Sequence, residues 1–129
     1  MKIYQKENCI SVTYFDSPKY ILYEWSKMWV KLEDFKEMHL TALKTIKEKG
    51  VTSLITDASI VTDIPMDECV EWLGKELIPL LSNAGVKRII TIVSGSALSR
   101  IGTKSWQNKV MGIDMYDVKD KTEALKLLI

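Results

Sequence analysis

Apolar residues in the first part of the chain follow the two-residue period of β-strands. Residues 10–15 (ISVTYF) alternate across two faces, and residues 20–25 (YILYEW) are again rich in strand-forming side chains. Between them, the Asp-Ser-Pro-Lys segment 16–19 favours a tight turn. The pattern predicts a β-hairpin, to which residues 2–4 add a short edge strand.

The period then changes to that of a helix over residues 32–49. Apolar side chains recur there at spacings of three and four residues: Phe35, Met38, Ala42, Leu43 and Ile46. Gly50 follows, and glycine is favoured after a last helical turn because it adopts positive φ without a Cβ clash. His39 lies beside the apolar stripe. We interpret it as a boundary residue rather than a base, because the sequence indicates no nucleophilic or acidic partner for it.

A helix followed by Gly-Val and a buried strand then occurs twice, in KEKGVTSLIT and SNAGVKRIITIV. This order is typical of βαβ units, in which the strands are parallel. The later elements that we predict are a strand at 51–56, a helix at 66–84, a strand at 87–93, a short helix reaching about residue 109, a strand at 115–118 and a helix at 121–129. The fold class is therefore α/β. We expect one domain over residues 1–129, with a mixed sheet of about five strands covered by about four helices.

Composition narrows the function classes. The chain is 47% hydrophobic and 27% charged with a net charge of +1, which argues against a broad nucleic-acid surface. Cys9 and Cys69 lie far apart and in no metal-ligand spacing, so we interpret them as reduced thiols and expect no metal and no cofactor. No apolar run approaches the length of a membrane span, and the first residues do not resemble a signal peptide. We expect a cytoplasmic protein.

Two polar segments leave the carboxyl ends of predicted parallel strands, where ligands usually bind to open sheets. We take their polar residues, with two residues of the following helix, as the candidate ligand- or partner-binding set: Asp57, Ser59, Thr62, Asp63, Asp67, Trp72, Ser94, Ser96, Ser99 and Arg100. The functional interpretation is a small polar pocket or a phosphorylatable surface. The alternative is ordinary turn and capping chemistry, which requires the same residue types.

The order of elements resembles the STAS fold of bacterial anti-sigma-factor antagonists, and the segment 56–64 resembles the STAS stretch in which a strand ends in Asp. More specifically, the chain is similar to the SpoIIAA-like group of small bacterial proteins, which is grouped with STAS and CRAL-TRIO lipid-transfer domains. That resemblance rests on Trp72-Leu73, Pro79 to Leu81, Ala84 to Arg88 and Glu123 to Leu125. It covers most of the chain and implies a regulatory or protein-interaction role.

The antagonists carry a phosphorylatable serine at the start of the second helix, whereas the matching stretch here is Pro65-Met66-Asp67. The resemblance therefore carries no phosphoserine switch over to this chain. Asp67 supplies negative charge at that position, but one carboxylate is a poor copy of a phosphate.

We expect a non-enzymatic regulatory domain with a protein partner. One alternative is a carrier of a small apolar or amphipathic ligand, which predicts an enclosed apolar pocket of a few hundred Å³. Another is a small hydrolase that uses Asp57 or Asp63. A homodimer is a further alternative, because a small sheet with an edge strand can pair with a second copy of itself.

Overall fold

The structure is a computed structural model that describes residues 1–128, and six strands form its single sheet. Strands β1 to β3 are antiparallel neighbours, and β3 to β6 are parallel. Their bounds are β1 Lys2–Lys6, β2 Ile10–Asp16, β3 Lys19–Trp25, β4 Ser53–Asp57, β5 Arg88–Ile92 and β6 Asp114–Val118. The predicted hairpin is β2–β3, and the predicted edge strand is β1.

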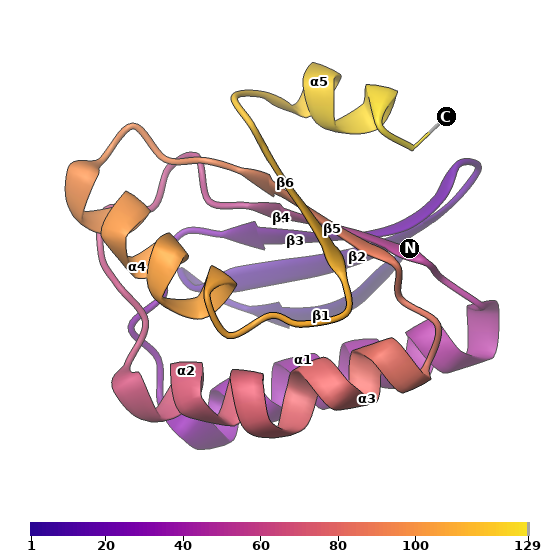
Figure 1. Cartoon of the computed structure of the whole chain (residues 1–129), viewed down its shortest axis with the longest axis horizontal. Helices are drawn as coiled ribbons and strands as arrows, with labels where there is room; N and C mark the ends of the chain where they lie inside the picture. The colour runs from indigo at the N-terminus through magenta and orange to yellow at the C-terminus, as the bar shows by residue number, and fades with distance from the viewer. Residues whose placement is uncertain (129) are drawn as a thin grey trace.

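Helices cover both faces of this sheet (Figure 1). One face carries α1, the run from α2 to α3, and α4, whereas α5 lies alone on the other. The bounds are α1 Leu32–Lys49, α2 Asp67–Trp72, the π-helical segment η1 Leu73–Leu77, α3 Ile78–Asn83, α4 Ala97–Gln107 and α5 Lys121–Lys126. The predicted fold class is confirmed.

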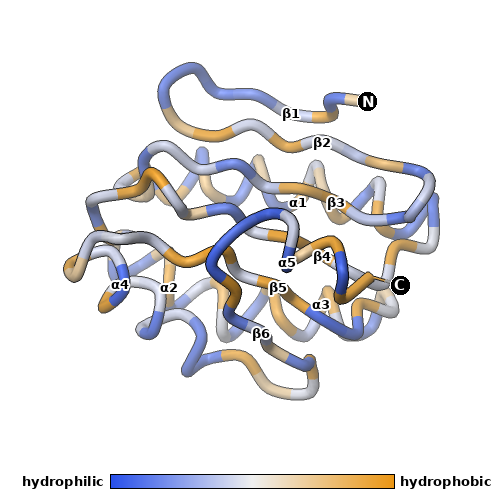
Figure 2. Tube along the Cα trace, turned by 90° about the horizontal axis from the view of Figure 1, so that it is seen from above, coloured by the Kyte–Doolittle hydropathy of each residue, from blue (hydrophilic) through white to orange (hydrophobic). Residues whose placement is uncertain are grey.

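The two faces of the sheet bury separate apolar clusters because successive strand residues point to opposite sides. Ile21, Leu54 and Ile89 lie in one register row and pack under α1, η1 and α3. Leu22 and Ile55, one residue further along, belong to the smaller cluster beneath α5. Figure 2 shows α5 lying across the central strands β4 and β5.

The strands lie in the sheet in the same order as in the sequence. Each parallel connection therefore returns to the neighbouring strand, through α1, through the α2–α3 run and through α4 in turn. Open sheets usually form a ligand crevice where the strand order reverses. Because this order never reverses, the carboxyl ends of β3, β4 and β5 do not flank a crevice of that kind.

The second helix is less regular than its sequence pattern predicts. Its middle turn, η1, is π-helical, and the N–H of Ile78 donates to the carbonyl of Leu73 five residues earlier. Pro79 follows directly; it has no N–H, and in a continuous α-helix its ring would clash with the carbonyl of Lys75. The widened turn precedes this proline, so α2, η1 and α3 form one run instead of a regular helix over 66–84.

Other boundaries agree closely with the prediction. Helix α1 begins and ends at the predicted residues, and Gly50 follows it with φ of 67°. Helix α5 ends at Lys126, and the last residue of its predicted range, Ile129, lies outside the described residues. Cys9 and Cys69 are buried free thiols, and burial raises the pKa of Cys69 to about 11. Within residues 1–128, no helix combines the length and apolar character that a membrane crossing requires.

Helix α4 packs closely on the loop before α2 at Gly102. A Cβ at Gly102 would lie 2.8 Å from Ile64 Cγ2 and 3.0 Å from Pro65 Cδ. We expect Gly102→Ala to lower the free energy of unfolding by about 1 kcal/mol, because the clash outweighs the better helix propensity of alanine. Urea unfolding measures this. Gly95→Ala is the matched control, since no atom lies within 4 Å of its Cβ position; equal effects of the two variants would contradict the prediction.

Candidate functional site

A polar row crosses the sheet at the carboxyl end of β3 and β4. Ser11, Glu24 and Asp57 are register neighbours on three adjacent strands, so their side chains share one face. This face of the sheet is the one that α5 covers, and the polar row follows the apolar cluster beneath α5 along β3 and β4. With Trp25, Ser26, Ser59 and Ile60, this row lines an open groove of about 330 Å³. The groove holds two of the candidate residues, Asp57 and Ser59, and Asp57 Oδ1 accepts from the Ser59 N–H at 2.9 Å.

The loops after β4 and β5 are joined by a buried serine. The Ser94 hydroxyl donates to the carbonyl of Val61 at 2.6 Å and accepts from the N–H of Ser96 at 2.9 Å. The structure thus brings together the two polar segments that the sequence singled out. Ser94 does so as an internal link, however, because its side chain is buried.

We expect Ser94→Ala to lower the free energy of unfolding by about 1–2 kcal/mol, because it leaves a buried carbonyl and an N–H without their partner. Ser59→Ala is the matched control, since that side chain is exposed. Chemical denaturation of both variants measures the difference. If Ser94→Ala were as stable as Ser59→Ala, the hydroxyl would not be holding the loops together.

Asp63 fastens the segment between β3 and α1. Its two carboxylate oxygens accept from the N–H groups of Met28, at 2.9 Å, and Trp29, at 3.0 Å. Both oxygens are thus engaged by backbone, and Asp63 does not line the groove that contains Asp57. The two acids are not brought together as the hydrolase alternative requires. Among residues 1–128, no cluster of three or more His, Cys, Asp or Glu side chains is placed to hold a metal.

Three further candidates, Ser96, Ser99 and Arg100, lie in the first turn of α4 or directly before it. Ser96 caps the helix by accepting from the Ser99 N–H at 3.3 Å, and Arg100 donates to the carbonyls of Ser94 and Gly95. Ser99 is fully buried, so it cannot be modified in the folded chain. Capping and turn chemistry therefore accounts for most of this loop.

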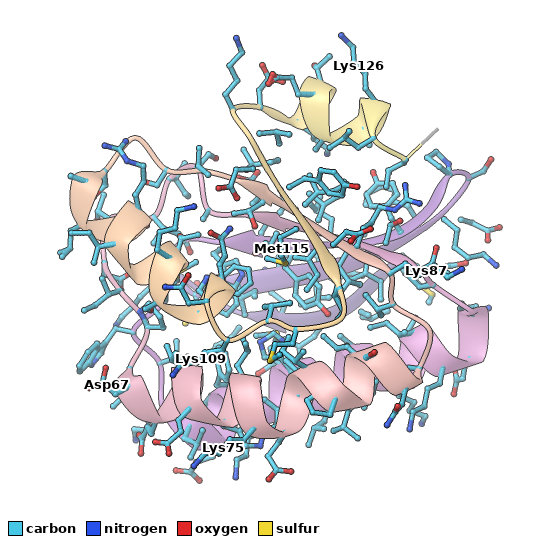
Figure 3. The ribbon with its side chains drawn as sticks, in the orientation of Figure 1. Asp67, Lys75, Lys87, Lys109, Met115 and Lys126 are labelled. Carbon is cyan, nitrogen blue, oxygen red and sulfur yellow. The ribbon has the colours of Figure 1, made fainter. Side chains whose placement is uncertain are left out.

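Three candidates lie on the surface of the 62–72 region. Thr62 and Asp67 are exposed, and Asp67 begins α2 at the end nearest α4 (Figure 3). Trp72 is half-buried, with its ring edge-on to Phe35 at 5.9 Å and Lys36 Nζ 5.9 Å from its centre. Trp72 is therefore a core-edge residue, whereas Trp106 on α4 is buried.

Exposed apolar side chains gather at this same end of the molecule, which sequence reasoning did not identify. Trp29 is 51% exposed, Ile60 69%, Leu98 52% and Ile101 67%. They belong to three segments that the bonds of Asp63 and Ser94 tie together, and Figure 1 shows α4 beside these loops. We call these four residues the apolar end patch. The sequence did contain one signal: Leu98 and Ile101 are three residues apart, and this spacing places two side chains on the same face of a helix.

A buried cavity of about 60 Å³ lies on the other side of the sheet, under the helices. Its fifteen lining residues are all buried, and most are apolar: Tyr23, Trp25, Met28, Phe35, His39, Leu54, Thr56, Pro65, Val70, Leu73, Leu77, Ile78, Leu81, Ile89 and Trp106. The volume is well below the few hundred Å³ that the carrier alternative predicts. The indole N–H of Trp25 donates to Thr56 Oγ1 at 3.1 Å within this wall.

His39 lines this cavity, so its interpretation as a boundary residue is wrong. Its side chain is 9% exposed and lies among aromatic rings, with Phe35 at 4.5 Å and Tyr23 at 5.7 Å between centres. Burial lowers the pKa of His39 from 6.5 to about 3 and raises the pKa of Tyr23 well above its ordinary range. Both imidazole nitrogens are buried without a hydrogen-bond partner. The sequence contained a signal for this position: His39 is four residues from both Phe35 and Leu43, so it shares their face of the helix, which packs against the sheet.

Comparison with solved structures finds a close match in architecture. The anti-sigma factor antagonist SpoIIAA in its unphosphorylated form is similar over 93% of this chain and 96% of that one, with a TM-score of 0.62 and 15% sequence identity. The chain has a SpoIIAA/STAS-like fold. The predicted resemblance is thereby confirmed at the level of the fold. Comparison with protein-family models finds no match, and comparison with curated proteins finds none either.

Proposed function

We propose that this chain is a non-enzymatic regulatory domain that binds a protein partner through the apolar end patch and the adjacent groove. The observation that carries the proposal is the exposure of four large apolar side chains on three tied segments. Apolar side chains gathered at one place on a surface are typical of contact sites. The likeness to an anti-sigma factor antagonist, a protein named for an interaction, supports the same conclusion.

The groove supplies the polar complement that a specific interface needs. Glu24 and Asp57 are neighbours across β3 and β4, and Ser11, Ser26 and Ser59 line the same groove. Interfaces combine a buried apolar centre with a polar rim. A partner that fits both features presents an apolar anchor for the patch and basic or hydrogen-bond-donating groups for the two carboxylates.

Asp67 gives this end of the molecule a fixed negative charge at the start of α2. Because its side chain is a carboxylate, the charge is present without any modification. We infer that partner binding here does not depend on phosphorylation of this position. Asp67→Ser is expected to change affinity only modestly, through loss of one exposed charge.

Site-directed photocrosslinking tests the proposal. A photoreactive residue at position 98, in cells that naturally make this protein, is expected to capture one partner, which Ile60→Asp with Ile101→Asp abolishes. Leu40→Asp is the matched control, since Leu40 is 44% exposed on α1, away from the patch. The proposal fails if position 98 captures nothing, or if Leu40→Asp removes the captured protein as completely as the patch variants do.

A further inference from the structure

The cavity under the helices has the properties of a ligand site. It is walled on one side by β3, β4 and β5 and on the other by α1, η1, α3 and α4. Its lining is almost wholly apolar, and its few polar groups include the Trp25–Thr56 pair, which is already hydrogen-bonded. A largely apolar wall with a few polar groups is how small-molecule sites are usually built.

Among these polar groups, the imidazole of His39 is both buried and without a hydrogen-bond partner among the described residues. Buried side-chain nitrogens nearly always have a hydrogen-bond partner in folded proteins. Within the part of the chain that the structure describes, neither Nδ1 nor Nε2 of His39 has one, although the residue is about nine-tenths buried and lines the cavity. An occupant that hydrogen-bonds to the ring would satisfy it.

The chemistry of the wall restricts the occupant to a neutral molecule. The residues that line the cavity include no Asp, Glu, Lys or Arg, so a charged ligand would be buried without a counter-charge. The neutral ring offers one N–H donor and one bare nitrogen acceptor. A hydroxyl group pairs with either nitrogen, because it both donates and accepts.

The volume restricts the occupant further. A dry protein cavity of about 150 Å³ binds benzene, and this one measures about 60 Å³. We propose that the cavity is a binding site for short-chain alcohols, with the hydroxyl paired to His39 and the alkyl part among the apolar side chains. The site lies across the sheet from the groove and does not rest on the proposed partner function.

The π-helical segment supports this assignment. Leu73 and Leu77, the first and last residues of η1, both line the cavity, and so does Ile78 next to them. π-helical turns inside helices occur frequently at functional sites. Here the widened turn forms one wall of the cavity.

The histidine makes a direct test available, because it is the only one in the sequence. The imidazole ¹⁵N signals of wild-type protein are therefore unambiguous in a titration with ethanol at pH 7. The matched probe is chloroethane, which has the same carbon chain and no hydroxyl. We expect ethanol to shift the ring signals saturably through its hydrogen bond to the imidazole, and chloroethane to leave out the part of this shift that the hydrogen bond causes.

His39→Phe keeps a ring of similar size but removes both nitrogens. In this variant, we expect the alcohol to bind about fivefold more weakly relative to the chloroalkane than it does in wild type, because its hydroxyl is then buried without a partner. The fluorescence of the cavity tryptophans follows both titrations. An affinity ratio that His39→Phe leaves unchanged, or no saturable shift of the ring signals in the wild type, would overturn the proposal. If His39→Phe does not fold, the ring signals of the wild type decide alone.

Discussion

Lowering the pH from 7 to 5 is expected to reduce the free energy of unfolding by about 2 kcal/mol through His39 alone. The folded chain holds the pKa of this residue at about 3, whereas the unfolded chain restores it to about 6.5. Between these values the unfolded state binds the proton and the folded state does not. Stability therefore rises with pH across this range and is lost as the pH falls below 6.5.

The environment of His39 offers nothing to offset this loss. The rings that pack around it are Tyr23, Trp25, Phe35 and Trp72, all uncharged at these pH values. Lys36, whose Nζ lies 5.9 Å from the centre of the Trp72 ring, would repel an imidazolium. Protonation of the folded state therefore brings no new ion pair.

Urea unfolding of wild type and His39→Phe at pH 7, 6 and 5 measures the effect. The variant is expected to lose little stability over this range, because most carboxylates titrate below it in both states. At pH 7 the variant is expected to be more stable than wild type by about 1–3 kcal/mol, because two unpartnered polar atoms are gone. A wild-type curve parallel to that of the variant would show that His39 is solvated in the folded state.

The sequence predicts a helix or strand of this fold well where the pattern of apolar residues is long and depends only on neighbours along the chain. Helix α1 carries an unbroken apolar stripe and a glycine stop, and its bounds follow from these alone. The repeated helix-Gly-Val-strand pattern predicts β4 and β5, because buried parallel strands need no alternation. The π-helical turn escapes the pattern, because a widened turn and a regular helix bury nearly the same residues.

The candidate site was harder to predict, and the reason is physical. Serine and aspartate at the carboxyl ends of strands serve capping and ligand binding equally well. Only the contacts show that Ser94 and Asp63 hold loops together, whereas Asp57 and Ser59 line a groove. The cavity cannot be read from the sequence, since it arises from imperfect packing between two layers. A single polar residue beside the apolar stripe of α1, His39, was the one trace of it in the sequence.

The structural role of Asp63 leads to the second large effect. We expect Asp63→Ala to lower the free energy of unfolding by about 1.5–3 kcal/mol, because two backbone N–H groups lose a charged acceptor. Met28 lines the cavity and Trp29 belongs to the apolar end patch, so one carboxylate supports both proposed sites. Partner capture through the patch is therefore expected to weaken together with stability.

Asp63→Asn distinguishes this anchoring role from catalysis. The amide keeps one acceptor oxygen, so we expect this variant to lose about half as much stability as Asp63→Ala in urea unfolding. Asp67→Ala is the matched control, because that carboxylate is exposed at the start of α2 and its loss costs about 0.3–1 kcal/mol. A catalytic carboxylate would give the opposite result: full wild-type stability in Asp63→Asn with a lost activity. The two hydrogen bonds from Met28 and Trp29 favour the graded loss, since they engage both oxygens of Asp63 with backbone N–H groups.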